Sequence, residues 1–385
     1  MNRITAFKLP CNEQLGCTLF DNFPGEIRDR IFTFALSCYD DQARKWDRNS
    51  SFVRPDYSAP EVADTALLQT CQRIYAENWF RPWISAIHTF YLAAQGRKPD
   101  DKHVMSVAKL QPALNQLNAA HGEVEISHVR VFPQLYALEP GKEIGNILNM
   151  DNFFPRKLTI TIRHHDWWFW EQDERLLIRS WWVNVCRFPS SLSEICMELE
   201  SLQRKENQID WIAEEMTKAW HFERKDGTIL SANGGDFKVD LWSGSSTWER
   251  TRWLRDETQP GTNDYYVKTV IWKRNSAISE RPWAYDLHVP HTFPVIRRAT
   301  PSLSVSLIEE AQVPAGSSAQ ETLRLVQQWR EDHREVYGGI YDDDITEDDD
   351  DGNDENDEDG DDDDRSDWID ANGPSDEEGN EHLFT

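Results

Sequence analysis

The chain has few of the features that mark metal-binding, disulfide-stabilised or membrane proteins. Its 385 residues include only six cysteines, which are scattered and contain no Cys-x-x-Cys pair. Isolated cysteines on apolar helix or strand faces are usually inert thiols in a reducing compartment. No apolar run is long enough to span a bilayer, and residues 1–8 lack the apolar core of a signal peptide. We therefore expect a soluble protein of the cytoplasm or nucleus with no membrane partner.

Signatures of catalysis and of cofactor binding are also missing. The chain has no Gly-x-Ser-x-Gly elbow for a nucleophilic serine, and no Gly-Lys-Ser or Gly-Lys-Thr follows Gly234 and Gly235. The adjacent His164 and His165 point to opposite faces of a strand, so they cannot chelate one metal ion as a pair. No other group of Asp, Glu and His has the spacing of metal ligands. These observations predict a protein that is not an enzyme and has neither a cofactor nor a metal site.

The chain has fewer basic than acidic residues, but the excess of acidic residues is confined to one segment. The formal net charge is −27, and 23 of the 68 acidic residues lie between positions 342 and 381, where the only basic residue is Arg365. The rest of the chain then holds 45 acidic and 40 basic residues, which is close to balance. Binding to nucleic acid needs a basic surface that displaces phosphate counterions, so the composition argues against a nucleic-acid partner. Residues 342–385 contain too few apolar side chains to fold, and we expect a disordered acidic tail there.

The acidic tail allows functions of its own. Dense Asp and Glu attract basic proteins such as histones, an effect that salt weakens. Thr346 and Ser375 are each followed by acidic residues, the pattern that acidophilic kinases prefer, and a phosphate at either site would deepen the negative field. The tail would therefore suit a scaffold or chaperone for basic proteins, or a segment that only keeps the protein soluble.

Alternating strands and helices are the main pattern in the middle of the chain. In residues 157–163, Leu158, Ile160 and Ile162 face one way and polar residues the other, which is the period of a strand. Further strands are predicted at 87–92, 126–132 and 192–200, and helices at 105–120, 172–187 and 203–219. This order favours right-handed crossovers and an at least partly parallel sheet. Turn signals after Trp220 predict an antiparallel meander that includes 237–242 and 265–273.

These patterns predict an α+β fold in three parts. The parts are an N-terminal helical module over residues 1–95, a mixed α/β body over 96–341 and the acidic tail over 342–385. The 17 tryptophans of the chain predict a large buried core, because each ring removes a wide apolar area from water. The sheet of the body is expected to be mixed, with a degenerate leucine-rich-repeat-like curve as an alternative form.

Two short segments near the start of the chain are the most informative. In the first, Pro24 suits the start of a helix and Glu26 places a carboxylate in its first turn. One face of this helix then carries the apolar residues Ile27, Ile31, Phe34 and Ala35, so it must pack on something. The second segment has the same character and places Leu67, Cys71, Ile74 and Tyr75 together.

Together the two segments resemble the F-box-like module of many filamentous-fungal proteins, which has the form Pro-x-Glu-Ile-x-x-x-Ile-Phe followed by a Leu-x-x-Cys-x-x-Ile helix. The resemblance implies that the module docks onto the Skp-type adaptor of a cullin-based ubiquitin ligase while the body binds a client protein. The matching positions, which the resemblance assigns to adaptor binding, are Pro24, Ile27, Ile31, Phe32, Leu68, Cys71 and Tyr75. The chain departs from the pattern because Phe23 replaces the usual leucine and because the polar insertion at 39–57 is unusually long.

Two other interpretations stay open at this point. The apolar helix faces would look the same if they packed on the chain's own body and bound no adaptor. The segment 164–171 places aromatic rings beside Asp166 and Glu171, which would suit an enzyme acting on carbohydrate with the two carboxylates as general acid and base. An aromatic core with solvated carboxylates explains the same residues.

Overall fold

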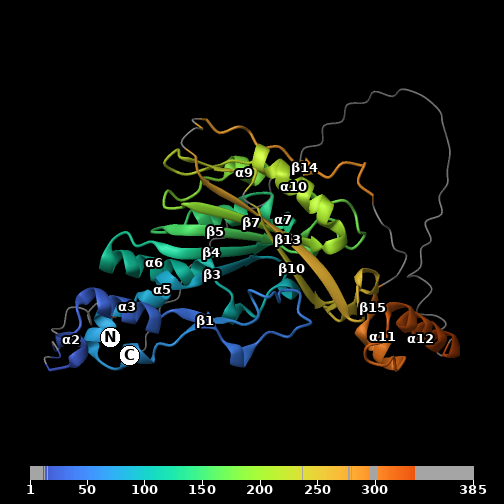
Figure 1. Cartoon of the computed structure of the whole chain (residues 1–385), viewed down its shortest axis with the longest axis horizontal. Helices are drawn as coiled ribbons and strands as arrows, with labels where there is room; N and C mark the ends of the chain where they lie inside the picture. The colour runs from blue at the N-terminus through green and yellow to red at the C-terminus, as the bar shows by residue number, and fades with distance from the viewer. Residues whose placement is uncertain are drawn as a thin grey trace, which may run out of the picture. The chain divides into compact units, whose positions relative to one another are not determined.

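A curled mixed sheet of eight strands organises the described part of the chain (Figure 1). The computed structural model describes residues 12, 14, 16–235, 237–275, 278, 280–294 and 302–333. The strand order is β3-β4-β5-β7-β13-β9-β8, and β10 also pairs with β13. The predicted tail at 342–385, with Thr346 and Ser375, lies outside the described residues.

The first half of the sheet is parallel and the second half is antiparallel. The parallel strands are β3 (Ile87–Leu92), β4 (Ile126–Pro133), β5 (Pro155–Ile162) and β7 (Glu194–Leu202). The antiparallel strands are β13 (Thr262–Arg274), β10 (Lys238–Ser245), β9 (Ile229–Ala232) and β8 (Phe222–Glu223). The predicted mixed sheet is therefore confirmed. A leucine-rich-repeat-like curve would need parallel strands throughout, and the antiparallel β13 replaces it with a different curl.

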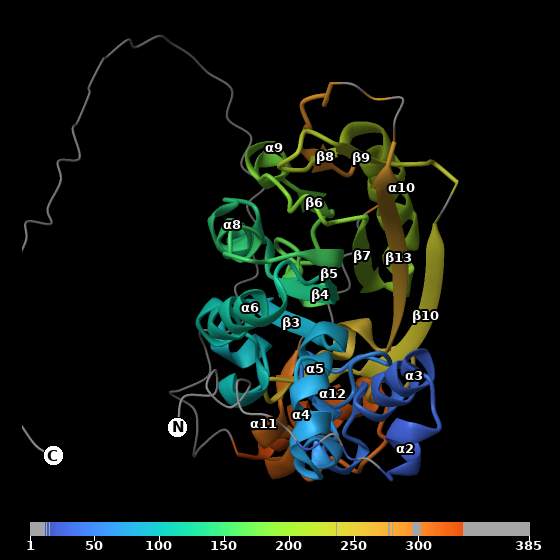
Figure 2. The same cartoon turned by 90° about the vertical axis from the view of Figure 1, so that its left-hand side faces the viewer.

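Helices cover one face of the sheet (Figure 2). The parallel strands need crossover connections, and these contain α6 (Val107–His121), α7 (Leu135–Leu138), α8 (Lys142–Leu148) and α9 (Trp181–Val185). The longest later helix, α10 (Glu206–Ala219), packs on β13 and β7. Side chains of α6, α8 and α10 join Leu158, Ile160 and Ile195 of the strands in one hydrophobic cluster. The apolar half of the strand alternation is thus the core side of the sheet.

Three tryptophans account for much of this core. Trp182, Trp220 and Trp272 are each fully buried. The indole of Trp272 donates to the carbonyl oxygen of Trp220 at 2.7 Å, and the rings of Trp182 and Trp220 meet edge to face at 5.8 Å. These contacts satisfy a buried N–H group and use the preferred aromatic geometry. The expectation of a large tryptophan-rich core is confirmed.

The helix predicted at 172–187 is not formed. The segment contains β6 (Leu177–Ile178), which pairs with β14 (Leu287–His288), and only then the short α9. Asp173 lies in the left-handed backbone region with φ 59° and forms ion pairs with Arg204 and Lys205 at 2.7 and 2.8 Å. These long-range contacts override the helical spacing of the apolar residues in the segment.

The N-terminal part begins with α2 (Thr18–Asp21) and α3 (Gly25–Ala35), followed after an insertion by the 3₁₀ turn η2 (Ala66–Gln69), α4 (Gln72–Asn78) and α5 (Arg81–Ser85). The insertion leaves and returns through two paired strands, β1 (Cys38–Asp40) and β2 (Glu61–Ala63). Cys38 stands opposite Ala63 in this pair, so the chain comes back to the place where it left. The long insertion therefore does not separate α3 from α4.

The remaining elements are short. A small sheet contains β11 (Thr247–Trp248), β12 (Thr251–Arg252) and β15 (Leu303–Ser304). Two helices, α11 (Val305–Glu310) and α12 (Ala319–Asp332), pack with Leu254, Leu303 and Val326 in a separate hydrophobic cluster. The other 3₁₀ turns are η1 (Gln42–Arg44), η3 (Gln95–Arg97), η4 (Asp101–His103), η5 (His164–Asp166), η6 (Gln203–Lys205) and η7 (Leu254–Asp256).

The orientation of α3 can be tested by two phenylalanines on the same helix. Phe32 is 2% exposed inside a small cluster, whereas Phe34 is 70% exposed. We expect Phe32→Ala to lower the free energy of unfolding by about 3–5 kcal/mol, because the side chain leaves a cavity. The matched control Phe34→Ala should change it by less than about 0.5 kcal/mol. Urea denaturation of both variants provides the measurement, and equal effects would show that α3 is rotated relative to this description.

Candidate functional site

Helix α3 presents two different apolar faces. Phe32 and Leu36 point into a cluster with Leu68 and Ile74, and all four side chains are buried. On the neighbouring face Ile27, Ile31 and Phe34 remain exposed, as does Phe23 just before the helix. The described residues thus leave a row of apolar side chains on α3 without cover. We call Phe23, Ile27, Ile31 and Phe34 the open face of α3.

Polar contacts hold α3 in this orientation. The guanidinium of Arg81 pairs with Asp29 of α3 and donates to the hydroxyl of Thr33 at 2.8 Å. Arg28 donates to the carbonyl oxygen of Phe23 at 2.8 Å, which fixes the entry into the helix. Because these contacts involve residues on the sides of the helix, they do not cover the open face.

The second N-terminal segment is broken at Cys71 and does not form one helix. Cys71 is the N-cap of α4, and its sulfur accepts a hydrogen bond from the Ile74 amide at 3.5 Å. Of the seven residues assigned to adaptor binding by resemblance, Pro24, Ile27 and Ile31 are exposed, Cys71 and Tyr75 are partly buried, and Phe32 and Leu68 are buried. Phe32 and Leu68 therefore pack inside the chain and are not part of the surface that a partner would meet.

The insertion between α3 and α4 covers part of the polar face of the sheet. Arg54 and Tyr57 bond to each other through their backbones and form a tight turn. The ring of Tyr57 packs on Tyr91 and Phe132, two residues of β3 and β4. The strand alternation at 157–163 and 192–200 is confirmed, but its polar side is not solvated as the pattern suggested. Thr161, Arg163 and Glu200 are all buried on that side.

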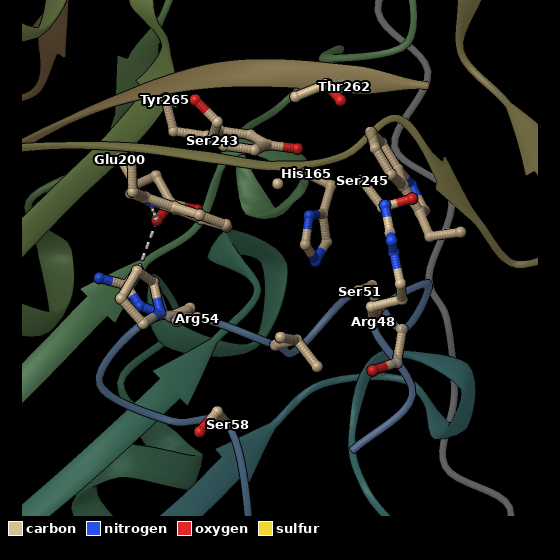
Figure 3. A pocket seen from close by; sticks show the side chains of 16 residues that line it. Arg48, Ser51, Arg54, Ser58, His165, Glu200, Ser243, Ser245, Thr262 and Tyr265 are labelled. Atoms are coloured by element: carbon tan, nitrogen blue, oxygen red, sulfur yellow. Dashed lines mark hydrogen bonds and ion pairs between the residues drawn. The ribbon is translucent and has the colours of Figure 1, made fainter. Parts of the chain in front are cut away.

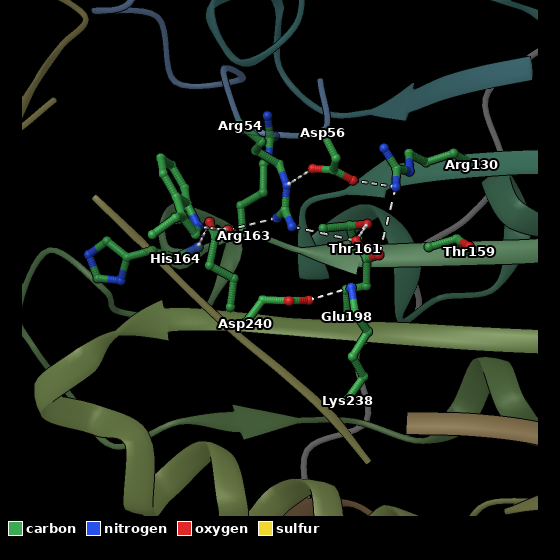
Figure 4. A network of polar contacts seen from close by, with 12 residues as sticks. Arg54, Asp56, Arg130, Thr159, Thr161, Arg163, His164, Glu198, Lys238 and Asp240 are labelled. Carbon is green, nitrogen blue, oxygen red and sulfur yellow. Dashed lines mark hydrogen bonds and ion pairs between the residues drawn. The ribbon is translucent and has the colours of Figure 1, made fainter. Parts of the chain in front are cut away.

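A network of ion pairs joins the insertion to the sheet (Figure 4). Arg54 is 5% exposed and lies 2.7 Å from Glu200, 3.5 Å from Glu198 and 3.3 Å from Asp56. Asp56 in turn pairs with Arg130 of β4 at 2.6 Å. A buried carboxylate is tolerated when a cation and further hydrogen bonds compensate its lost hydration. Arg54 supplies this compensation to two neighbouring acids of β7.

The charges of this network determine its electrostatics. Burial raises the pKa of Glu200, and the Arg54 guanidinium partly offsets this effect. Burial would also raise the pKa of Asp56, but Arg54 and Arg130 together hold it at about 2. Burial opposes the charge of Arg54, yet Glu200, Asp56 and Glu198 raise its pKa above the usual range. The network is therefore fully ionised at Arg54 and Asp56 near neutral pH.

Asp166 and Glu171, the pair considered for carbohydrate cleavage, both line one pocket but lie in different surroundings. Asp166 is buried and pairs with Arg163, which contacts both of its carboxylate oxygens at 2.7 and 3.0 Å. Arg163 also donates to the carbonyl oxygen of Arg97 at 3.0 Å. Glu171 is exposed. The Asp166 carboxylate is thus held by Arg163 in the turn after β5.

A pocket of about 460 Å³ lies between the insertion and the end of the sheet (Figure 3). Its walls include Arg48, Ser51 and Arg54 from the insertion, Glu200 from β7, His165 from η5 and Trp242 from β10. The imidazole of His165 projects into the space between the strands and the insertion (Figure 3). The same Arg54–Glu200 pair that fastens the insertion therefore forms part of the pocket wall.

Sequence reasoning missed most of this pocket. It predicted a strand at 192–200 and noted the polar insertion at 39–57, but it assigned no contact between them. One usable signal was present, because residues 157–163 and 192–200 place charges of both signs on the polar side of adjacent strands. What it could not supply is the pairing of Arg54 with Glu200, which are 146 residues apart.

The described residues contain no group of three or more His, Cys, Asp and Glu that could hold a metal ion. Within the same residues, no helix has both the length and the apolar character needed to cross a membrane. No protein-family model, curated protein or solved structure matches this chain. Its function must therefore be argued from the surfaces and side chains described above.

The importance of Arg54 can be measured with a double-mutant cycle. Arg54→Met leaves the buried Glu200 and the partly buried Glu198 without their nearest arginine, so we expect the free energy of unfolding to fall by about 3–5 kcal/mol. Adding Glu200→Gln should recover part of this loss, since one uncompensated charge is then removed. Arg48→Met, at an exposed arginine of the same insertion, is the matched control and should have little effect. A loss of similar size in the control would contradict the proposed role of Arg54.

Stability should also depend on the protonation of His164. Burial lowers the pKa of His164 to about 3; Asp256 opposes this shift, and Lys205, Arg204 and Arg255 add to it. Because the unfolded histidine binds its proton near pH 6.5, stability is complete above that pH and is lost as the pH falls. We expect this group to contribute a loss of about 2 kcal/mol between pH 6.5 and pH 5.

The variant His164→Asn removes the titrating group while keeping a polar atom near Ser201, which lies 3.4 Å from His164 Nδ1. Urea denaturation between pH 7.5 and pH 5 should give a shallower pH dependence for this variant than for the parent. His288→Asn, at an exposed histidine, is the matched control. An unaltered slope in His164→Asn would contradict the assignment.

Proposed function

We propose that this protein binds a Skp-type adaptor of a cullin-based ubiquitin ligase through the open face of α3. In this proposal the chain is an F-box-like interaction protein whose body selects a client, and it acts in the cytoplasm or nucleus. The single observation that carries the proposal is the exposure of Ile27 and Ile31, which are 44% and 38% exposed on a helix that buries Phe32 against the chain. Both positions also match the F-box-like motif.

The separation of α3 into a buried face and an exposed apolar face supports a docking role. Phe32 and Leu36 hold the helix to the chain, and Ile27, Ile31 and Phe34 take no part in that packing. Clustered exposed apolar side chains mark interaction surfaces in soluble proteins. Anchors at helical spacings of three and four residues are typical of a helix that lies in an apolar groove of a partner.

The long insertion is compatible with an F-box-like module. Pairing of β1 with β2 closes the insertion at its base, so α3 and α4 still contribute to one cluster. The insertion projects from this base to the sheet, where Arg54 meets Glu200. Its length can therefore be explained by its contact with the body, without a change in the part that would meet the adaptor.

Adaptor capture by the full chain is the decisive experiment. The double variant Ile27→Asp, Ile31→Asp should fold, because both side chains are already exposed, and should reduce adaptor binding by at least a hundredfold. The matched control Arg30→Glu changes an exposed polar residue of the same helix and should still bind. Isothermal titration with purified adaptor gives the affinities, and circular dichroism checks the folding of each variant.

Deletion of residues 342–385 separates this proposal from an acidic-tail scaffold. Adaptor binding should survive the deletion, whereas capture of basic proteins by the tail would be lost. Failure of the folded parent to bind adaptor, or equal binding by the Ile27→Asp, Ile31→Asp variant, would overturn the proposal.

A further inference from the structure

The pocket of Figure 3 contains a buried polar atom that has no partner. His165 is 7% exposed, and its Nε2 atom has no hydrogen-bond partner among the described residues. Burial and the nearby Arg163 lower the pKa of His165 well below its usual value, so the ring is neutral at pH 7. Leaving a buried polar group unpaired is unfavourable, because the group has lost its bonds to water. A ligand that bonded to Nε2 would remove this penalty.

One wall of the same pocket is aromatic, and neighbouring residues hold its tryptophan in place. The indole of Trp242 stacks on the ring of Tyr265, with centroids 4.4 Å apart and planes 20° apart. Its Nε1 atom donates to Glu200 at 3.1 Å, which fixes the indole in the plane of the wall. A Cβ atom at Gly244 would lie 2.5 Å from the Trp242 ring, so only glycine leaves room for it there. Trp242 remains half-buried and offers apolar surface to the pocket.

The two buried charged groups of the pocket, Arg54 and Glu200, favour a neutral, polar ligand; Arg48 also lines the pocket but is exposed. Arg54 and Glu200 are already paired at 2.7 Å, so a charged ligand would compete with a formed ion pair. A hydroxyl group can accept a hydrogen bond from a guanidinium and donate one to a carboxylate. The hydroxyls of Ser51, Ser245 and Thr262 line the same space and add further donors and acceptors (Figure 3).

We propose that this pocket binds a neutral, hydroxyl-rich ring of the size of a pyranose sugar. The ring would lie against Trp242, with hydroxyls bonded to His165 Nε2 and to the Arg54–Glu200 pair. The volume of about 460 Å³ is within the range of small-molecule sites, which is roughly 300–1,000 Å³. The site is separate from the open face of α3, and it stands whether or not the chain binds an adaptor.

Saturation-transfer NMR on the full chain tests this site. The probes are glucose, mannose and N-acetylglucosamine, compared with glucose 6-phosphate and glucuronate. At least one neutral sugar should receive saturation, and the two anionic sugars should receive less. The methyl glycosides of the binding sugars distinguish the source of the ligand: transfer to them indicates a sugar attached to another molecule, and transfer to the reducing sugar alone indicates a free metabolite.

Two variants locate the binding in the pocket. His165→Phe keeps an aromatic ring but cannot form hydrogen bonds, and Trp242→Ala removes the wall. Each should weaken binding at least tenfold, while Trp283→Ala, at a tryptophan 66% exposed and outside the pocket lining, should not. Circular dichroism checks the folding of each variant. If Trp242→Ala does not fold, the binding measured for His165→Phe alone tests whether the sugar lies in the pocket. Absence of transfer to every neutral sugar, stronger transfer to the anionic sugars, or unchanged binding in a folded His165→Phe variant would overturn the proposal.

Discussion

A cation from the insertion compensates the acids on the polar face of the curled sheet. Glu198 and Glu200 lie side by side on β7, and both carboxylates would lose hydration under any cover. Arg54 reaches both of them from the insertion, at 3.5 and 2.7 Å, and so allows the insertion to pack there. An apolar segment in the same place would deprive the two acids of the cation that Arg54 supplies. The charge of Arg54 thus favours the insertion as the segment that covers this face.

The same contact links the N-terminal helices to the body. The insertion starts and ends at the paired strands β1 and β2, next to the cluster formed by Phe32 and Leu68. Its far end is fastened by Arg54 to the sheet. The helices therefore have a fixed base, and the open face of α3 is displayed on a supported helix. A docking surface on such a support loses little conformational entropy when it binds.

The pocket forms because the insertion covers the polar face of the sheet only in part. The insertion packs tightly where Tyr57 meets Phe132, at a ring distance of 5.5 Å, but further along it leaves space beside His165 and Trp242. The wall of this space is rigid, because the Trp242 indole is stacked on Tyr265 and bonded to Glu200. The open face of α3, proposed as a docking surface, and the small polar pocket therefore share no residues.

Local periodicity in the sequence determined much of the framework: the strands at 87–92, 126–132 and 157–163, the helix at 203–219 and the apolar side of the sheet were all predictable. Such patterns depend on neighbouring residues and on the geometry of a single element. Tertiary structure alone decided that α3 keeps Ile27 exposed while it buries Phe32, and that β6 replaces a predicted helix. It also decided that Glu200 is buried against Arg54. These outcomes depend on contacts between distant segments. The periodicity of one segment carries no information about which remote side chain will pair with a charged residue in it.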